Sequence, residues 1–456
     1  MLSPRATLWR NRSLRFLIGA SASLVSAAGG VIRNKWLAQH LETSGLGVLA
    51  QIFSGQAWLG TATGLGLGLP VARAVGSAMG SGNSAEVRKT VWAAFSLLTI
   101  SGAVAISCGL LFAARISQAL LGSTEYAPLV RISMVGTAGI AVQHTLMGLF
   151  AGRSDLRAPL TFAVAGGGVA TLATLLLVPR LGLFGGALGA AIGIPAGCLG
   201  ALYFHRREYA PAILPLPRPS LTPERARALL GIATAGLLAS LIEQGTLLGL
   251  RSNYLRWNGV AANGLLQAAI ALSQQVGALF YAYLASYAFG KISGIQGSQG
   301  ARGTCDYTRR HWAPLILAAA AAFAVAMVAA TPLLRLLYSH RFDPARPLMA
   351  WALFGEFGRV ALQTWALGAL PLGGMKLWLP ISLSFPASLA ASYGVFAATG
   401  AGMQSLPRAY AAAGFFSLAA GGLLMSRRGI TLSARDLAFL LAAAVALFAL
   451  AGWVAG

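Results

Sequence analysis

Three charged residues lie inside long apolar stretches of the sequence and are the first candidates for chemistry. Glu243 lies in the apolar run 228–250, and Glu356 and Arg359 lie in the run 347–370. A lone charge at the centre of a bilayer costs roughly 3 kcal/mol or more, so such residues persist where they face water, a partner or a bound group. Because residues three apart share one face of a helix, Glu356 and Arg359 either pair structurally or line a binding cavity, and the pattern leaves both interpretations open.

The composition predicts that these charges lie in a membrane protein. Of the 456 residues, 57% are hydrophobic and only 10% are charged, which is typical of a chain solvated by lipid. The net charge of +23 comes from arginines and lysines in short connections, where they fix orientation and meet lipid headgroups, so nucleic-acid binding is not expected. The sequence holds no nucleotide-binding lysine motif, and we expect neither an enzyme nor a cofactor. No metal site is expected from the three widely spaced cysteines, Cys108, Cys198 and Cys305.

Apolar runs of roughly 20 residues, the length that crosses a bilayer, recur along the chain. They predict an all-α polytopic membrane protein. Its spans are expected at about 15–37, 46–70, 90–112, 127–150, 158–178, 184–204, 228–250, 262–289, 312–337, 347–370, 378–399 and 407–426. A further run at 436–455 predicts one extra C-terminal helix. Lys and Arg are denser in the N-terminus and in every second connection, above all 205–227, which predicts that these segments are cytoplasmic.

The first half of the chain recurs in the second half. The stretch 47–76 matches 264–293, about 217 residues later, and Gly47 aligns with Gly264 without a gap. Six spans in each half give both halves the same orientation, which predicts a pseudo-two-fold axis along the membrane normal and a cavity between two lobes. The predicted segments are an N-lobe at 1–204, an inter-lobe linker at 205–227, a C-lobe at 228–426 and an extra span at 427–456.

Polar residues inside the predicted spans are the candidates for lining this cavity. In the eighth span, Gln267, Gln274 and Tyr281 repeat at intervals of seven, and in the fourth span Ile140 is the apolar counterpart of Arg359. A single buried histidine is more typical of a hydrogen-bonded core residue than of a proton carrier, and glutamines also join helices structurally. The complete predicted set is Arg33, Gln51, Trp58, His144, Glu243, Gln267, Gln274, Glu356, Arg359 and Gln363.

The N-terminal half resembles a known family of transporters. The resemblance rests on a basic residue late in the first span, the turn LETSGLGVLAQ, a Gly-rich second span ending in VARAVG, and the string VPRLGLFGGALGAAIG at 178–193. These features are similar to the polysaccharide flippases of the multidrug/oligosaccharidyl-lipid/polysaccharide (MOP) exporter superfamily.

The resemblance implies a secondary-active exporter in the bacterial inner membrane. It implies movement of a polyprenyl-diphosphate-linked oligosaccharide from the inner to the outer leaflet, coupled to H⁺ or Na⁺, for surface polysaccharide biosynthesis. A polysaccharide polymerase is the partner that it suggests.

Other functions stay open at this point. The alternatives are a cation-coupled multidrug exporter or a lipid II flippase of the same superfamily, a channel, and a membrane scaffold without transport. The one extra C-terminal run departs from the two extra spans typical of lipid II flippases. The acidic residues of the N-lobe fall in expected loops, which favours an anionic cargo over a cationic drug.

Overall fold

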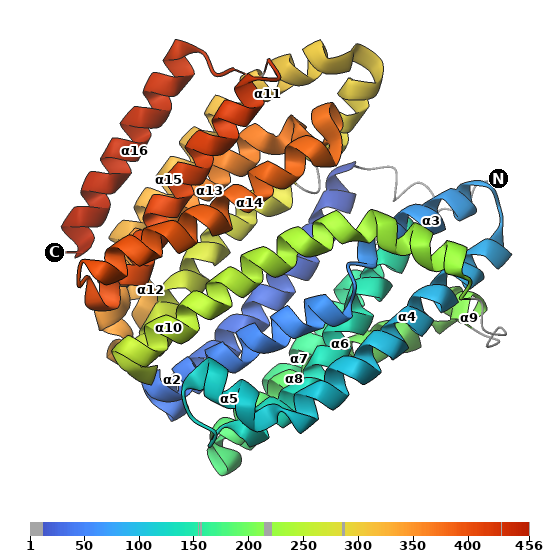
Figure 1. Cartoon of the computed structure of the whole chain (residues 1–456), viewed down its shortest axis with the longest axis horizontal. Helices are drawn as coiled ribbons and strands as arrows, with labels where there is room; N and C mark the ends of the chain where they lie inside the picture. Colours follow the sequence, from blue (N-terminus) through green and yellow to red (C-terminus); the bar gives the residue numbers. More distant parts are fainter. Residues whose placement is uncertain are drawn as a thin grey trace. The chain divides into compact units, whose positions relative to one another are not determined.

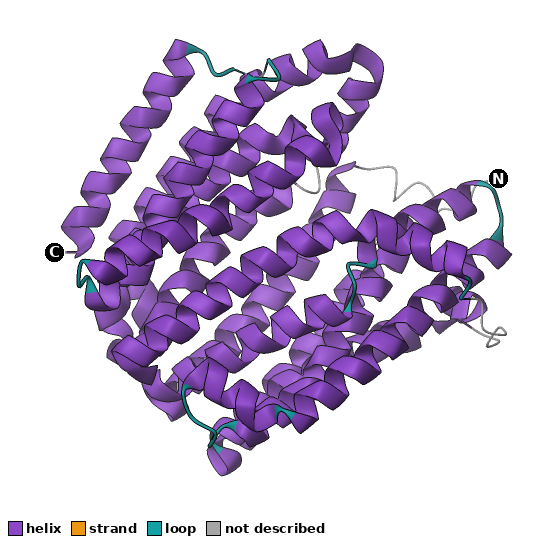
Figure 2. Cartoon of the chain, in the orientation of Figure 1, coloured by secondary structure: helices purple, strands orange, loops and turns teal. Residues whose placement is uncertain are grey.

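The computed structural model describes residues 12–153, 155, 157–213, 221–284, 288–429 and 431–455. In these residues the secondary structure consists of α-helices, short 3₁₀ turns and π-helical residues at positions 284 and 288, joined by short loops (Figures 1 and 2). The predicted all-α fold class is therefore confirmed.

The chain divides into two compact units, each described here by itself. Unit 1 comprises Met1–Leu41 and Gln51–Leu241, and unit 2 comprises Glu42–Ala50 and Ile242–Gly456. The boundaries fall inside two long helices, so the first part of the second long helix packs within unit 1, where Ala233 and Leu237 contact Gly66. The lobe boundaries expected at 205–227 stay a prediction.

Unit 1 is built around a packed series of helices from the first half of the chain. Its helices are α2 (Arg12–Thr63), α3 (Gly68–Gly80), α4 (Ser84–Leu111), α5 (Ala113–Leu121), α6 (Ala127–Gly152), α7 (Arg157–Leu181), α8 (Leu183–Phe204) and α9 (Arg206–Ile213). α8 packs on both α6 and α7. Glycines at every fourth position of α8 face α7, and a Cβ on Gly189 would lie 2.6 Å from the Thr174 hydroxyl, so the two backbones approach closely as in small-residue membrane packing.

Unit 2 has its core where α13 and α14 pack against α15. Its elements are α10 (Pro223–Tyr283, shared with unit 1), α11 (Phe289–Val328), α12 (Ala330–Leu337), η2 (His340–Ala345), α13 (Arg346–Trp365), η3 (Ala366–Gly368), α14 (Ala369–Ala398), η4 (Gly402–Gln404), α15 (Ser405–Ser426) and α16 (Ala434–Ala455). α16, drawn in red at the end of the chain in Figure 1, packs on α11 and α13. This is the extra C-terminal helix that the sequence predicts.

Nine helical segments of the described chain are long and apolar enough to cross a membrane. Two of them, Pro223–Tyr283 and His340–Ala398, each contain two predicted spans, so the nine segments hold eleven of the thirteen apolar runs. The remaining two runs lie in α2 and the start of α3. The chain is a multi-pass membrane protein.

α2 and α10 are both broken at a residue with positive φ. In α2 the break is at Glu42 (φ 57°, ψ −166°), and in α10 it is at Gly259 (φ 84°, ψ 171°). The two positions are related by the same lag that aligns Gly47 with Gly264. The repeat in the sequence is therefore also a repeat in the backbone.

Beyond these breaks the two helices touch each other reciprocally, within unit 2. Gly47 has no room for a Cβ against the Val260 carbonyl oxygen, and Gly264 has none against the Thr43 carbonyl oxygen. The two contacts are related by the repeat, as a pseudo-two-fold axis requires. Asn263 strengthens the crossing by donating from Nδ2 to the Gly47 carbonyl oxygen at 2.8 Å.

Candidate functional site

The three intramembrane charges of the sequence meet in one cluster in unit 2. Glu243 comes from α10 before its break, and Glu356 and Arg359 come from successive turns of α13. Arg359 Nη2 donates to Glu243 Oε1 at 2.5 Å, and Arg359 Nη1 donates to Glu356 Oε2 at 3.4 Å. The sequence predicted the second pairing as one of two interpretations but did not pair Arg359 with Glu243.

Two tyrosines and a phenylalanine complete the surroundings of this cluster. Tyr410 on α15 accepts a hydrogen bond from Arg359 Nη1 at 2.7 Å and donates its own proton to Glu356 Oε2. Tyr281, on α10 beyond the break, donates to Glu356 Oε1 at 2.7 Å. The guanidinium carbon of Arg359 lies 4.2 Å from the centre of the Phe385 ring on α14, a cation–π distance. Four helices thus hold one arginine and two carboxylates.

Burial differs sharply between the two carboxylates. The Glu356 side chain is 0% exposed, whereas Glu243 is 41% exposed and Arg359 is 17% exposed. Three donors converge on Glu356, and together they stabilise a negative charge in a site that excludes water. Glu243 has Arg359 as its ion-pair partner in this cluster and stays accessible. With both carboxylates ionised, the two negative charges and the one positive charge of Arg359 give the cluster a net charge of about −1.

Close backbone packing explains why these side chains meet. A Cβ on Gly277 of α10 would lie 2.6 Å from Glu356 Oε1, so the absence of a side chain there leaves room for the carboxylate. A Cβ on Gly355 would lie 2.5 Å from the Tyr410 carbonyl oxygen, so α13 and α15 are in backbone contact beside the cluster. In unit 1, Gly60, the repeat counterpart of Gly277, packs on the apolar side chain of Ile140. The polar cluster is therefore a property of the second half of the chain.

The other predicted residues of unit 2 lie outside this hydrogen-bond network. Gln363 and Gln274 are exposed, and Gln267 is partly buried. Gln363 continues the face of Arg359 by helical spacing, yet among the described residues it makes no hydrogen bond to the cluster. Their role as lining residues stays a prediction.

The predicted residues of unit 1 are placed in different local settings. Arg33 is partly buried, and its Nε has no hydrogen-bond partner among the residues that the structure describes. Gln51 is fully buried, and the Trp58 indole donates to the Leu241 carbonyl oxygen at 3.0 Å, a structural contact to α10. His144 is partly buried, with its ring beside the backbone of Gly64. The choice between a packed histidine and a proton carrier at this position stays a prediction.

Solved structures match this fold closely. The chain has a TM-score of 0.72 to a multidrug resistance MATE family transporter of the MOP superfamily in an inward-facing conformation, at 13% identity, covering 91% of this chain and 98% of that one. A second MATE structure, in complex with MaD3S, has a TM-score of 0.63 at 16% identity, covering 91% and 94%. Identities this low establish the fold alone.

Curated sequences match over nearly the whole length. The chain is 25% identical over 436 residues to the lipid III flippase of Escherichia coli (strain K12), covering 93% of this chain and 99% of the relative. The lipid III flippase of Shigella flexneri gives the same values. The chain has the fold of the MATE transporters and is distantly related in sequence to the lipid III flippases. No family model matches this chain.

The sequence patterns did not predict two residues of the cluster, Tyr410 and Phe385. Tyr410 and Phe385 lie on spans whose patterns are apolar, and neither shares a helix with Glu356. Tyr281 did carry a signal, because it shares a face with Gln267 and Gln274. Contacts between helices far apart in the sequence are set by packing and have no periodic signature within either helix.

Proposed function

We propose that the chain is a flippase that moves a lipid-linked oligosaccharide, carried on a polyprenyl diphosphate, from the inner to the outer leaflet of a bacterial inner membrane. The observation that supports this most strongly is the similarity to lipid III flippases over 93% of this chain and 99% of the relative. Similarity over this length favours a shared transport cycle over a single shared domain. The glycan delivered to the outer surface would serve a polysaccharide polymerase.

In this proposal the cluster around Arg359 binds the anionic part of the cargo in alternation with Glu243. Arg359 offers a planar fork of donors that suits a diphosphate or an acidic sugar. In the structure one of its terminal nitrogens is bonded to Glu243. Cargo would therefore compete with the Glu243 carboxylate for Arg359, while Glu356, Tyr410 and Phe385 keep the guanidinium in place.

The same competition gives a route for coupling to H⁺ or Na⁺. Two carboxylates face one guanidinium, so the cluster has a spare negative charge that a cation can neutralise. Of the two acids, Glu243 is the one that is accessible and that has fewer donors around it. We assign the coupling cation to Glu243, the accessible acid that competes with cargo for Arg359.

A multidrug exporter is the second candidate, favoured by the MATE fold itself. An exporter of cationic drugs is expected to use acidic residues among its spans. The acidic residues within the first 204 positions lie at a helix break, a first helical turn or a loop, at Glu42, Glu86, Glu125 and Asp155. This arrangement supports the anionic cargo. Export of cationic dyes from cells that express the chain would favour the multidrug exporter instead.

Expression in a bacterial strain that lacks its own lipid III flippase tests the proposal in cells. We expect the chain to relieve accumulation of the lipid-linked oligosaccharide. Arg359→Gln should abolish this relief even when transport is normalised to the amount of inserted protein, which we expect to fall because Glu356 loses its partner. Glu243→Gln, which mimics the loaded acid, should bind cargo yet lose dependence on the ion gradient. Full relief by Arg359→Gln would remove the cluster from the mechanism.

A further inference from the structure

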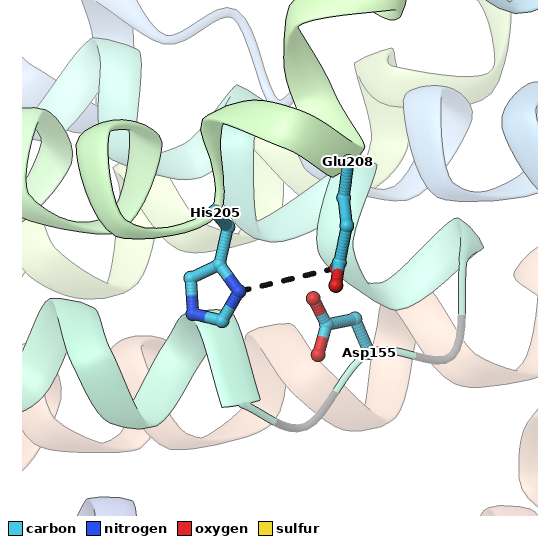
Figure 3. Close-up of side chains that lie close together, drawn as sticks. All are labelled: Asp155, His205 and Glu208. Carbon is cyan, nitrogen blue, oxygen red and sulfur yellow. Dashed lines mark ion pairs between the residues drawn. The ribbon is translucent and has the colours of Figure 1, made fainter.

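A second group of ionisable side chains lies in unit 1, away from the cluster on α13. Asp155 lies between α6 and α7, His205 between α8 and α9, and Glu208 in the first turn of α9. One ligand atom from each residue lies within 4.8 Å of those of the other two. Figure 3 shows the imidazole and both carboxylates turned toward a common point, with 3.9 Å between His205 Nδ1 and Glu208 Oε2.

Thr161 orients the His205 ring through the nitrogen that faces away from the carboxylates. The Thr161 hydroxyl oxygen lies 3.0 Å from His205 Nε2 and 3.1 Å from the Arg157 carbonyl oxygen. Nδ1 is thereby left facing Glu208 and Asp155. When the hydroxyl donates to Arg157 it accepts from Nε2, and Nδ1 of the neutral ring then offers its lone pair to a cation.

Asp155 is held in place by partners that leave it able to bind a cation. Its Oδ1 accepts from the Arg157 amide at 2.8 Å, and its Oδ2 accepts from the Tyr209 hydroxyl at 2.6 Å. Oδ2 keeps a free lone pair. Carboxylates that ligate metals are commonly held in position by hydrogen bonds of this kind.

We propose that Asp155, His205 and Glu208 bind one divalent transition metal ion, of which Zn²⁺ is the representative probe. The ligands are His205 Nδ1 and one oxygen from each carboxylate, and a water molecule completes four-coordination. One nitrogen and two carboxylate oxygens form a donor set that suits Zn²⁺. Bonds of about 2.0–2.2 Å require ligand atoms about 3.4 Å apart. The 61% exposed side chain of Glu208 can move the short distance that closes the site.

Such an ion would join three segments of unit 1: the connection after α6, the end of α8 and the start of α9. Arg153 already fixes α9, because its Nη1 donates to the Glu208 carbonyl oxygen at 2.6 Å and its guanidinium lies 4.9 Å from the Tyr209 ring centre. This contact uses the backbone of Glu208 and leaves its carboxylate available. The metal would therefore add a bridge between segments that are already in position.

Zinc binding by the purified full-length protein tests the proposal. The protein would carry an affinity tag without histidines and serine in place of Cys108 and Cys305, so that neither supplies competing ligands. Titration of Zn²⁺ against a fluorescent chelator should give one bound equivalent. Glu208→Gln and His205→Ala should each weaken binding by about tenfold or more, since even outer-sphere partners contribute factors of about 10–100.

His40→Ala is the matched control, because His40 is exposed and its described contacts are with Trp36. It should leave Zn²⁺ affinity unchanged. Glu208→Gln, at an exposed position, keeps the test valid if His205→Ala fails to fold. Absence of a bound equivalent at 100-fold excess of Zn²⁺ would overturn the proposal, as would affinity that neither ligand variant lowers. In either case a proton on His205 would be the cation between the carboxylates.

Discussion

Replacing Arg359 by glutamine should destabilise the protein by about 3–5 kcal/mol, because it leaves a buried carboxylate without its cationic partner. The carboxylate in question is Glu356, whose side chain is 0% exposed. Replacing Glu243 by glutamine should cost much less. Its side chain is 41% exposed, and exposed ion pairs contribute about 0–1 kcal/mol.

Distance and burial make opposite predictions here, so the comparison is informative. The Arg359–Glu243 contact is the shorter one, at 2.5 Å against 3.4 Å for Arg359–Glu356. If the distance between the charged atoms alone determined the coupling energy, Glu243 would be coupled more strongly to Arg359 than Glu356 is. Because low local dielectric strengthens the buried interaction, we expect about 2 kcal/mol of coupling for Glu356–Arg359 and under about 1 kcal/mol for Glu243–Arg359.

Two double-mutant cycles measure these couplings, with glutamine as the neutral substitute at each position. The free energy of unfolding would be obtained for the wild type, the three single variants and the two double variants in one detergent. The double variant of Glu356 and Arg359 should be about 2 kcal/mol more stable than the sum of the two single changes predicts, without recovering oligosaccharide transport. Equal coupling in both cycles would refute the argument from burial, and recovered transport would make the pair purely structural.

Three further outcomes follow from the geometry. Glu42→Gly should raise the free energy of unfolding by about 1–2 kcal/mol in thermal or denaturant unfolding, because Glu42 has a backbone conformation that is essentially restricted to glycine; an unchanged or lower stability would contradict this. Gly277→Ala should destabilise the protein by about 1–3 kcal/mol through overpacking against Glu356. Gly249→Ala on the same helix should not, because the space around Gly249 is open. Equal losses of stability in the two variants would refute the close packing of Gly277 on Glu356. A cysteine at the exposed position 207, in a background without other cysteines, should resist a membrane-impermeant maleimide in intact cells, and strong labelling would overturn the predicted topology.

Much of the architecture could be predicted because membrane spans have a strong local signature. Eleven of the predicted apolar runs lie in the nine span-length helices of the described chain, and α16 is the predicted extra helix. The repeat could be recognised in the sequence because Gly47 and Gly264 lie at the same contact between α2 and α10, where neither position has room for a side chain. The positive φ of Glu42 was not predictable from its residue type, because glutamate rarely adopts this conformation. Its counterpart in the repeat, Gly259, also has a positive φ, which glycine adopts readily.

The candidate site could be predicted only in part. The cost of burying charge identified Glu243, Glu356 and Arg359, because any such residue in an apolar span needs a partner. Their mutual arrangement depends on how α10, α13 and α15 pack, which the spacing within each helix does not encode. For that reason the sequence missed Tyr410, whose hydroxyl joins Arg359 to Glu356.

Transfer of a lipid-linked oligosaccharide between leaflets of proteoliposomes tests the central claim most directly. The substrate would be a polyprenyl-diphosphate oligosaccharide with a fluorescent sugar, and a membrane-impermeant quencher would report the leaflet in which the sugar lies. We expect gradient-dependent transfer by the wild-type protein and loss of transfer in Arg359→Gln. Transfer no faster than in protein-free vesicles, with the wild-type protein folded and correctly inserted, would contradict it.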